Sequence, residues 1–160
     1  MVFAGHDRDV VLRQTALAKM RYHYRKSDTK EAGGILLGKV CPGRVSIEDA
    51  TTPNASDRSG RFFFIRSKVP AQEEIDRKWR ASDGRVIYLG EWHTHAEARP
   101  QPTGQDRQMI ESCLRTTVME IDFLLLLILG KEDSIWLGIQ TIAGLMEFRR
   151  NDLVKTGGRE

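Results

Sequence analysis

The sequence predicts a mixed α/β (α+β) domain in which one β-sheet is flanked by helices. Segments of helical periodicity alternate irregularly with short strands and hairpins, as in a sheet that is covered by helices. The run Phe123–Leu129 is apolar throughout, which is typical of a central strand buried on both faces. Because 160 residues suffice for one core, we expect a single domain over residues 1–150, followed by a polar tail over residues 151–160.

The first half of the chain predicts a helix and a hairpin. Apolar residues at three-, four- and seven-residue spacings predict a helix from Asp9 to about Arg25. Strands over 33–40 and 45–50 flank the turn signal Pro42-Gly43, so we expect them to pair as a hairpin. The remaining predicted elements are a loop over 51–60, a strand over 62–65, a helix over 70–82, a strand over 86–95, a helix over 104–116 and strands over 123–129, 135–139 and 145–149.

Local signals mark the ends of these later elements. Pro70 is suited to a helix start, and acidic residues between 73 and 76 lie in the early turns, where the helix dipole favours them. The pair Asp83-Gly84 ends that helix, and the proline-rich segment 100–102 requires a loop before the next one. Apolar residues alternate over 135–139, which predicts a half-buried strand.

Composition and charge limit the possible classes of function. The formal net charge is only +3, and no block of Lys and Arg is interleaved with aromatic residues, so we expect no nucleic-acid partner. The longest apolar run is far shorter than the roughly 18 residues of a membrane span, and the N-terminus has no apolar signal segment. We therefore expect no membrane association and a cytoplasmic location. Cys41 and Cys113 lack CxxC spacing, which favours two reduced, partly buried thiols over a disulfide.

A strand end that carries His93 and His95 predicts a metal site. Residues two apart on a strand point to the same face, so both imidazoles can reach one ion. Asp106, at the start of the following helix, can turn back toward that strand end. Two His and one carboxylate leave a tetrahedral position open, as in catalytic zinc sites. Each piece has a second interpretation: the His pair can be merely hydrogen-bonded, and Thr103 with Asp106 also forms an ordinary capping box.

Glu31 supplies one more acid, just before Gly33-Gly34. Metal-assisted amide hydrolysis needs a carboxylate that takes a proton from water and passes it to the leaving amine. Taken alone, however, a Glu between a helix and a strand is an ordinary surface residue. Only its combination with the histidines and Asp106 gives it functional weight.

These segments together resemble the JAMM (JAB/MPN) metalloprotease family. Residues 31–38, EAGGILLG, are similar to its first block, E-x-G-G-x-L-x-G, and residues 93–106 are similar to its second, H-x-H-x(7)-[S/T]-x-x-D. The resemblance implies one Zn²⁺ per chain, held by His93, His95 and Asp106. It also implies that Glu31 is the general base and then the general acid, and that the Thr103 hydroxyl, where the family usually has Ser, steadies the oxyanion. Ala96 replaces a frequent Pro, without touching a predicted ligand.

The resemblance further implies the substrate. Family members clamp an extended C-terminal tail as an added β-strand, for which the segments 51–65 and 97–102 are candidate walls, although the first is equally well a plain surface loop. The chain is most similar to prokaryotic peptidases that release the C-terminus of a cGAS-like nucleotidyltransferase from target proteins in CBASS antiviral operons. Processing of a bacterial ubiquitin-like protein, or a non-catalytic MPN interaction module, are the alternatives. We expect Trp92 to pack in the core.

Overall fold

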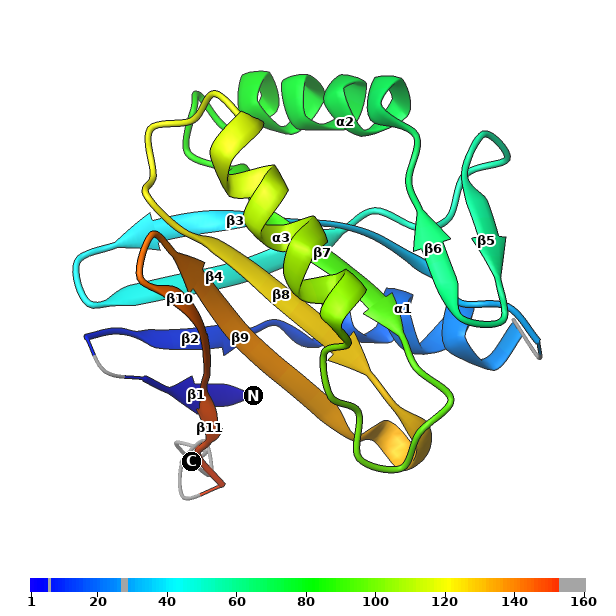
Figure 1. Cartoon of the computed structure of the whole chain (residues 1–160). Helices are drawn as coiled ribbons and strands as arrows, with labels where there is room; N and C mark the ends of the chain where they lie inside the picture. Colours follow the sequence, from blue (N-terminus) through cyan, green and yellow to red (C-terminus); the bar gives the residue numbers. More distant parts are fainter. Residues whose placement is uncertain (6, 27–28, 153–160) are drawn as a thin grey trace, which may run out of the picture.

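In the computed structural model, which describes residues 1–5, 7–26 and 29–152, one large sheet runs through the molecule (Figure 1). Its nine strands lie in the order β10-β9-β8-β7-β3-β4-β2-β1-β11, and β5 and β6 form a separate two-stranded sheet. The predicted class, a mixed sheet flanked by helices, is confirmed. The elements are β1 (Val2–Ala4), β2 (Asp9–Leu12), α1 (Gln14–Lys26), β3 (Gly33–Cys41), β4 (Arg44–Ala50), β5 (Arg58–Gly60), β6 (Phe63–Ile65), α2 (Lys68–Ala81), β7 (Ile87–Thr94), α3 (Gly104–Thr116), β8 (Leu124–Leu129), η1 (Lys131–Asp133), β9 (Ile135–Thr141), β10 (Gly144–Glu147) and β11 (Arg149–Arg150).

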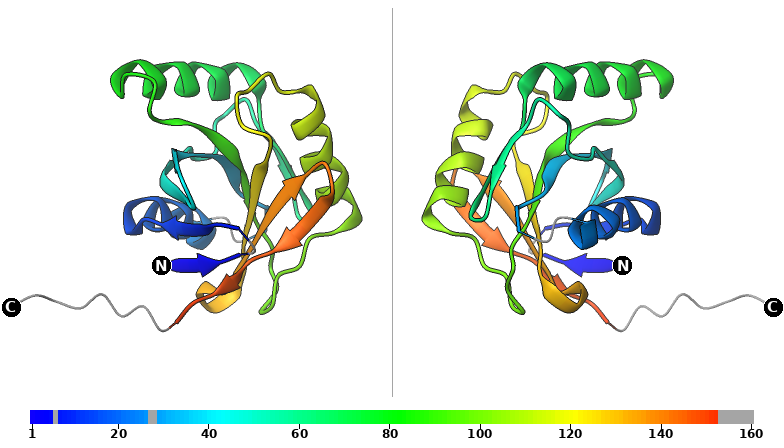
Figure 2. Two further views of the ribbon diagram at one scale, coloured as in Figure 1. Left: turned by 90° about the vertical axis from the view of Figure 1, so that its left-hand side faces the viewer. Right: turned by 90° about the vertical axis from the view of Figure 1, so that its right-hand side faces the viewer.

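Helices cover both faces of the sheet, which produces two hydrophobic cores. Leu17 and Met20 of α1 are buried against one face, whereas Ala71 of α2 and Ile110 of α3 are buried against the other. The two side views show α1 on one side of the sheet and α3 on the opposite side (Figure 2). The strands at the middle of the sheet are therefore shielded from water on both faces.

Strand β8 demonstrates this two-sided burial. All six of its residues are buried, and their side chains alternate between the two cores. Leu125 and Leu127 belong to the core beneath α1, and Leu126 and Ile128 to the core beneath α3. The prediction of a central strand here is confirmed, although the strand begins at Leu124 rather than one residue earlier.

The predicted helix over 9–25 is wrong at its beginning. Residues 9–12 form β2, which pairs in parallel with β4, and the helix begins only at Gln14. Val10 and Leu12 are both buried while their neighbours are half-buried, so the side chains alternate with the period of a strand. Val10 misled the prediction because it also lies at a seven-residue spacing from Leu17.

Several other predicted boundaries also differ from the structure. The helix predicted from Pro70 begins two residues earlier, and the loop predicted over 51–60 ends in strand β5. The last predicted strand is divided into β10 and β11 by the buried residue Phe148. Asp152 is the last described residue, so most of the predicted tail, residues 153–160, lies outside the described residues.

Cys41 and Cys113 are both free thiols, as expected. Cys113 is partly buried, but Cys41 is exposed at the end of β3, so the expected partial burial holds for only one of them. Of the helices in the described part of the chain, none has the length and apolar character that crossing a membrane requires.

Candidate metal centre

Pairing between β3 and β7 brings Glu31 to the two histidines. The strands are antiparallel, with Gly33 directly opposite His93. Two hydrogen bonds extend this pairing to the residue before β3. Thr94 N donates to Ala32 O at 2.9 Å, and Ala32 N donates to the side-chain oxygen Thr94 Oγ1 at 3.0 Å. Glu31, two residues before Gly33, is therefore level with the end of β7, although Glu31 and His95 are 64 positions apart in the sequence.

The Gly-Gly pair of the first block is required by close packing. A Cβ at Gly33 would lie 2.4 Å from the ring of Phe64, and a Cβ at Gly34 would lie 2.5 Å from Thr51. Both distances are shorter than any real Cβ contact, so a larger residue would force β6 or the segment after β4 away from β3. The glycines thus allow the neighbouring chain to approach the strand beside Glu31.

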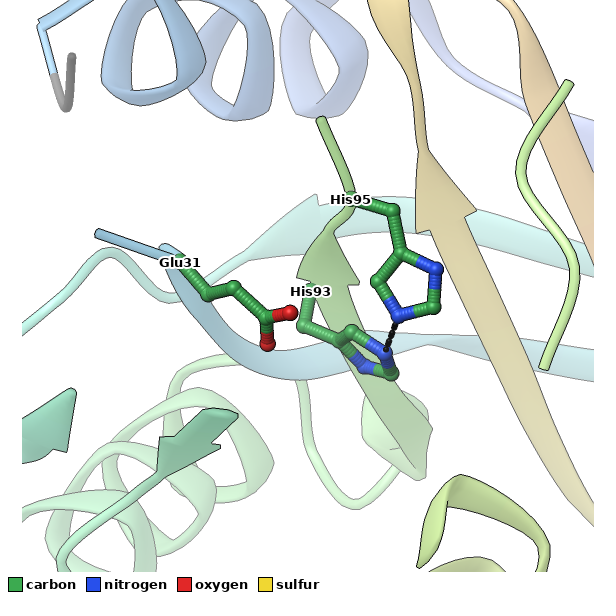
Figure 3. Close-up of side chains that lie close together, drawn as sticks. All are labelled: Glu31, His93 and His95. Carbon is green, nitrogen blue, oxygen red and sulfur yellow. Dashed lines mark hydrogen bonds between the residues drawn. The ribbon is translucent and has the colours of Figure 1, made fainter. Parts of the chain in front are cut away.

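The two imidazoles face each other at the end of β7. His93 Nε2 and His95 Nε2 are 3.1 Å apart, and both side chains are buried. The Glu31 carboxylate is directed toward the same space (Figure 3), and one ligand atom from each of these three residues lies within 4.8 Å of the others. The structure thus brings the predicted base and the two predicted histidine ligands together.

Asp106 joins the histidines from the first turn of α3. One carboxylate oxygen lies 3.1 Å from His93 Nε2, and the other lies 3.3 Å from His95 Nε2. The second oxygen also accepts a hydrogen bond from Thr103 N at 2.8 Å, and Thr103 Oγ1 accepts one from Asp106 N at 3.2 Å. The two interpretations of this motif therefore hold at once, because Asp106 completes a capping box while it faces both imidazoles.

The charges of these groups are strongly coupled. Burial raises the pKa of the Asp106 carboxyl, but the bonds with His93 and His95 outweigh it and hold that pKa far below its usual range. Burial lowers the pKa of His95, and the hydrogen bond and charge of Asp106 more than reverse the effect. For Glu31, burial dominates, so its pKa is raised despite the nearby histidines.

The donor atoms fit a tetrahedral metal ion. In a tetrahedral zinc site with bonds of about 2.0–2.1 Å, ligand atoms lie about 3.3 Å apart. The distances among His93 Nε2, His95 Nε2 and the Asp106 oxygens are 3.1–3.3 Å. Moreover, two imidazole nitrogens and a carboxylate, all common ligands of zinc, converge at one strand end with the Glu31 carboxylate beside them. The residues present therefore fit a divalent metal.

A second cluster, which the sequence analysis missed, lies on the same strand. Glu91 is buried and accepts bonds of 2.8 and 2.9 Å from Arg66 and one of 2.6 Å from the Tyr88 hydroxyl. Tyr88 and Glu91 share a face because Gly90, at φ 146°, forms a bulge where a Cβ would meet Leu125 O at 1.9 Å. The one available signal was an acidic residue inside an apolar strand.

Trp92 packs in the core, as expected. It is 1 % exposed and donates from Nε1 to Thr51 O at 2.9 Å, which ties β7 to the segment after β4. In contrast, Phe62, at the tip between β5 and β6, is 78 % exposed. The aromatic run over 62–65 is thus only partly used for packing.

Comparison with known proteins identifies the family. The family of prokaryotic homologues of the JAB domain matches residues 13–138. A protein of Pseudomonas aeruginosa named "CD-NTase/cGAS isopeptidase" is 42% identical over 95 residues, which are 59% of this chain and 60% of that protein. A protein of Vibrio cholerae with the same name is 31% identical over 129 residues, 81% of this chain and 80% of that protein. The chain belongs to the prokaryotic JAB family, and the predicted class of JAMM-type peptidase is confirmed.

A solved structure supports the fold. The solution structure of protein DSY2949 from Desulfitobacterium hafniense superposes with a TM-score of 0.62 and covers 94% of this chain and 99% of that one. The identity is 18%, so this likeness concerns the fold alone. Family membership also implies a metal, in agreement with the donor set at the end of β7.

Proposed function

We propose that this chain is a zinc-dependent isopeptidase that releases a cGAS-like nucleotidyltransferase (CD-NTase) from the proteins to which its C-terminus is joined. The observation that carries the proposal is the meeting of Glu31 with His93, His95 and Asp106 at one strand end. The names of the relatives support the substrate class and a role in CBASS defence. The two free cysteines are in keeping with a cytoplasmic site of action.

His93, His95 and Asp106 would hold the ion, one per chain. Imidazole and carboxylate ligands favour zinc among the common divalent metals, and three protein ligands leave a position for substrate or water. When bound, zinc polarises the scissile carbonyl and makes water more acidic. The capping box serves this role as well, because the hydrogen bond from Thr103 N fixes the orientation of the Asp106 carboxylate.

Glu31 would move the proton. Its carboxylate faces the ligand atoms from the segment just before β3, so it can take a proton from the attacking water. The same carboxyl then delivers that proton to the amine that leaves, which is a lysine side chain in an isopeptide. Burial raises the pKa of Glu31, and a base of higher pKa holds the proton more firmly between these two steps.

Thr103 would steady the carbonyl oxygen as negative charge develops on it. Its Oγ1 accepts a bond from Asp106 N, so the hydroxyl proton is free to be donated toward the site. The cap also restricts the position of the oxygen, because the first turn of α3 and the threonine hold each other. The β-methyl group further limits rotation about χ1.

The C-terminal tail of the CD-NTase would bind as an extended strand beside the site. The β5–β6 hairpin is a two-stranded sheet with open edges, and its exposed side chains include Phe62, Phe63 and Ile65. Glu31 N donates to Gly60 O at 2.8 Å, so the hairpin is tied to the catalytic segment. A strand paired with this hairpin would lead toward the histidines, with the segment 97–102 as the opposite wall.

The test is cleavage of a defined fusion. A CD-NTase from the host organism is joined through its last residue to a reporter protein and incubated with the zinc-loaded chain. We expect release of the reporter, with mass spectrometry placing the cut directly after the CD-NTase C-terminus. Glu31→Gln protein, which keeps the metal ligands, is the matched control and should be inert. Cleavage of only a ubiquitin-like fusion would replace the substrate assignment, and cleavage of neither would overturn the proposal.

A further inference from the structure

We propose that a basic pocket beside Glu31 binds a carboxylate of the substrate next to the scissile bond. This inference rests on the proposed function, because it concerns the same site. The pocket has a volume of about 690 Å³ and adjoins the end of β7. Its walls come from the end of α1, the segment before β3, the β5–β6 tip, the end of β7 and η1; the lining residues that matter here are Arg25, Lys30, Glu31, Arg61, Ala96 and Lys131.

The lining of this pocket carries an excess of positive charge. Arg25, Lys30, Arg61 and Lys131 are contributed by four different segments, against Glu31 as the one acidic residue among the described residues of the lining. All four cationic residues are exposed. Cations gathered from separate segments around one hollow create a local positive potential, which attracts an anionic group.

Within the described part of the chain, these four cations have no ion-pair partner, whereas their neighbours do. Arg21 of α1 and Asp133 of η1 bind each other at 2.8 Å, on the same two elements that supply Arg25 and Lys131 to the pocket. On η1, Asp133 is thus already paired outside the pocket, and Glu132 is not among the described lining residues. A carboxylate brought by a ligand would find the pocket cations without a competing acid among the described ion pairs.

The pocket lies at the same strand end as the histidines. Thr94 and Ala96, which line it, are the chain neighbours of His95, and Glu31 forms part of its wall. A peptide bound across the histidines and Glu31 would bring a residue near the scissile bond to the pocket mouth. Asp or Glu at that position would be attracted, and Lys or Arg would be repelled.

The carboxylate could come from either side of the scissile bond. One source is the tail that ends at the bond, and the other is the target protein around the acceptor lysine. Both supply the same chemistry, so two arms of one experiment separate them. Fluorescent isopeptides are made with a single Glu, Gln or Arg placed within two residues of the bond, on the tail side in one arm and on the lysine side in the other.

Binding is measured apart from cleavage, by fluorescence anisotropy with Glu31→Gln protein. In one arm, the Glu peptide should bind about fivefold tighter than the Gln peptide, and the Arg peptide should bind weaker still. Raising the salt from about 0.05 M to 0.5 M should remove most of the difference, because surface charges are screened. If Glu, Gln and Arg peptides bind alike in both arms, the inference is wrong.

Charge reversal at the pocket provides the second test. Arg61→Glu and Lys131→Glu, each in the Glu31→Gln background, should remove the preference for Glu, and the double variant should favour Arg. The matched control is Arg80→Glu, an exposed cation on α2 outside the pocket lining, which should keep the preference. A variant that merely unfolds cannot reverse a preference. An unchanged preference in the double variant would overturn the inference.

The two proposals fail in different ways. An isopeptide that wild-type protein cleaves equally well with Glu, Gln or Arg, and that binds without preference, refutes the pocket and leaves the isopeptidase intact. Peptides that bind with the expected preference but are never cut support the pocket and refute the peptidase activity proposed for this site.

Discussion

Strand β7 carries two clusters of polar side chains that differ in how completely they are satisfied. The first, here the closed cluster, consists of Tyr88, Glu91 and Arg66, and the second, the open cluster, of Glu31, His93, His95 and Asp106. In the closed cluster, every contact joins a donor to the Glu91 carboxylate at 2.6–2.9 Å. In the open cluster, imidazole nitrogens and carboxylate oxygens converge at 3.1–3.3 Å.

The difference separates a structural role from a functional one. A buried carboxylate that already has its donors gains nothing from an added ion, so the closed cluster fixes the junction between β6 and α2 against β7. Burial and the Glu91 charge raise the pKa of Tyr88, which keeps its hydroxyl a donor. The open cluster instead gathers carboxylates and imidazole nitrogens, which are metal ligands once deprotonated, so a cation would stabilise it. Two clusters only a few residues apart on one strand therefore have opposite needs.

The largest expected effect separates metal binding from proton transfer inside the open cluster. Both His95→Ala and Glu31→Gln should lower kcat/KM by about 10²–10⁴-fold, because each removes a group that acts in the chemical step. Only His95→Ala should also lose zinc, measured by elemental analysis of dialysed protein, since Glu31 is not a proposed ligand. Loss of zinc from both variants would mean that Glu31 is itself a ligand.

Breaking the closed cluster should affect stability instead. Arg66→Met leaves the buried Glu91 carboxylate without its cation, which should lower the free energy of unfolding by about 3 kcal/mol. The combined Arg66→Met and Glu91→Leu variant should recover much of this loss, because no unpaired charge remains. Urea unfolding measures both. Zinc content should stay at one per chain in each folded variant. A loss of zinc in the double variant would contradict the separate roles of the closed and open clusters.

The sequence predicted the open cluster far better than the closed one. His93 and His95 are two residues apart on a strand, so their common face follows from local geometry. Their meeting with Glu31 depends on the β3–β7 pairing, which periodicity does not reveal. That contact was predicted because the two motif blocks resemble a family in which they meet. Without the resemblance, Glu31 would have remained an ordinary surface acid.

The closed cluster could not be predicted from the same information. Arg66 and Glu91 are 25 residues apart, and no local pattern shows that the bulge at Gly90 places Glu91 on the face of Tyr88. The wrong start of the first helix has a similar cause, because the pairing of β2 with β4 overrides a helical spacing that Val10 also satisfies. In both cases, strand pairing between distant segments determined a structure that the local sequence pattern did not reveal.

The pH dependence of activity tests the protonation state within the open cluster. Burial raises the pKa of Glu31 above its ordinary value of 4.5, and the carboxylate is the form that accepts a proton. As the pH falls through this raised pKa, kcat/KM should fall about tenfold per pH unit, beginning above pH 4.5. Zinc content and circular dichroism at each pH control for loss of metal or fold. An acid limb at or below 4.5, with metal and fold retained, would mean that the charge of the bound cation outweighs the burial of Glu31.

The smallest effect is expected at the edge of the open cluster, for Thr103→Ser. Serine keeps the oxygen that caps α3 and the hydroxyl that is proposed to steady the oxyanion, and loses only the methyl group. We expect kcat/KM within about threefold of wild type and a stability change below about 0.5 kcal/mol. Thr103→Ala, which removes the cap, should cost about 1 kcal/mol. If Thr103→Ser and Thr103→Ala were equally active, the hydroxyl would have no part in the chemistry, and the role of Thr103 would be structural, like that of the closed cluster.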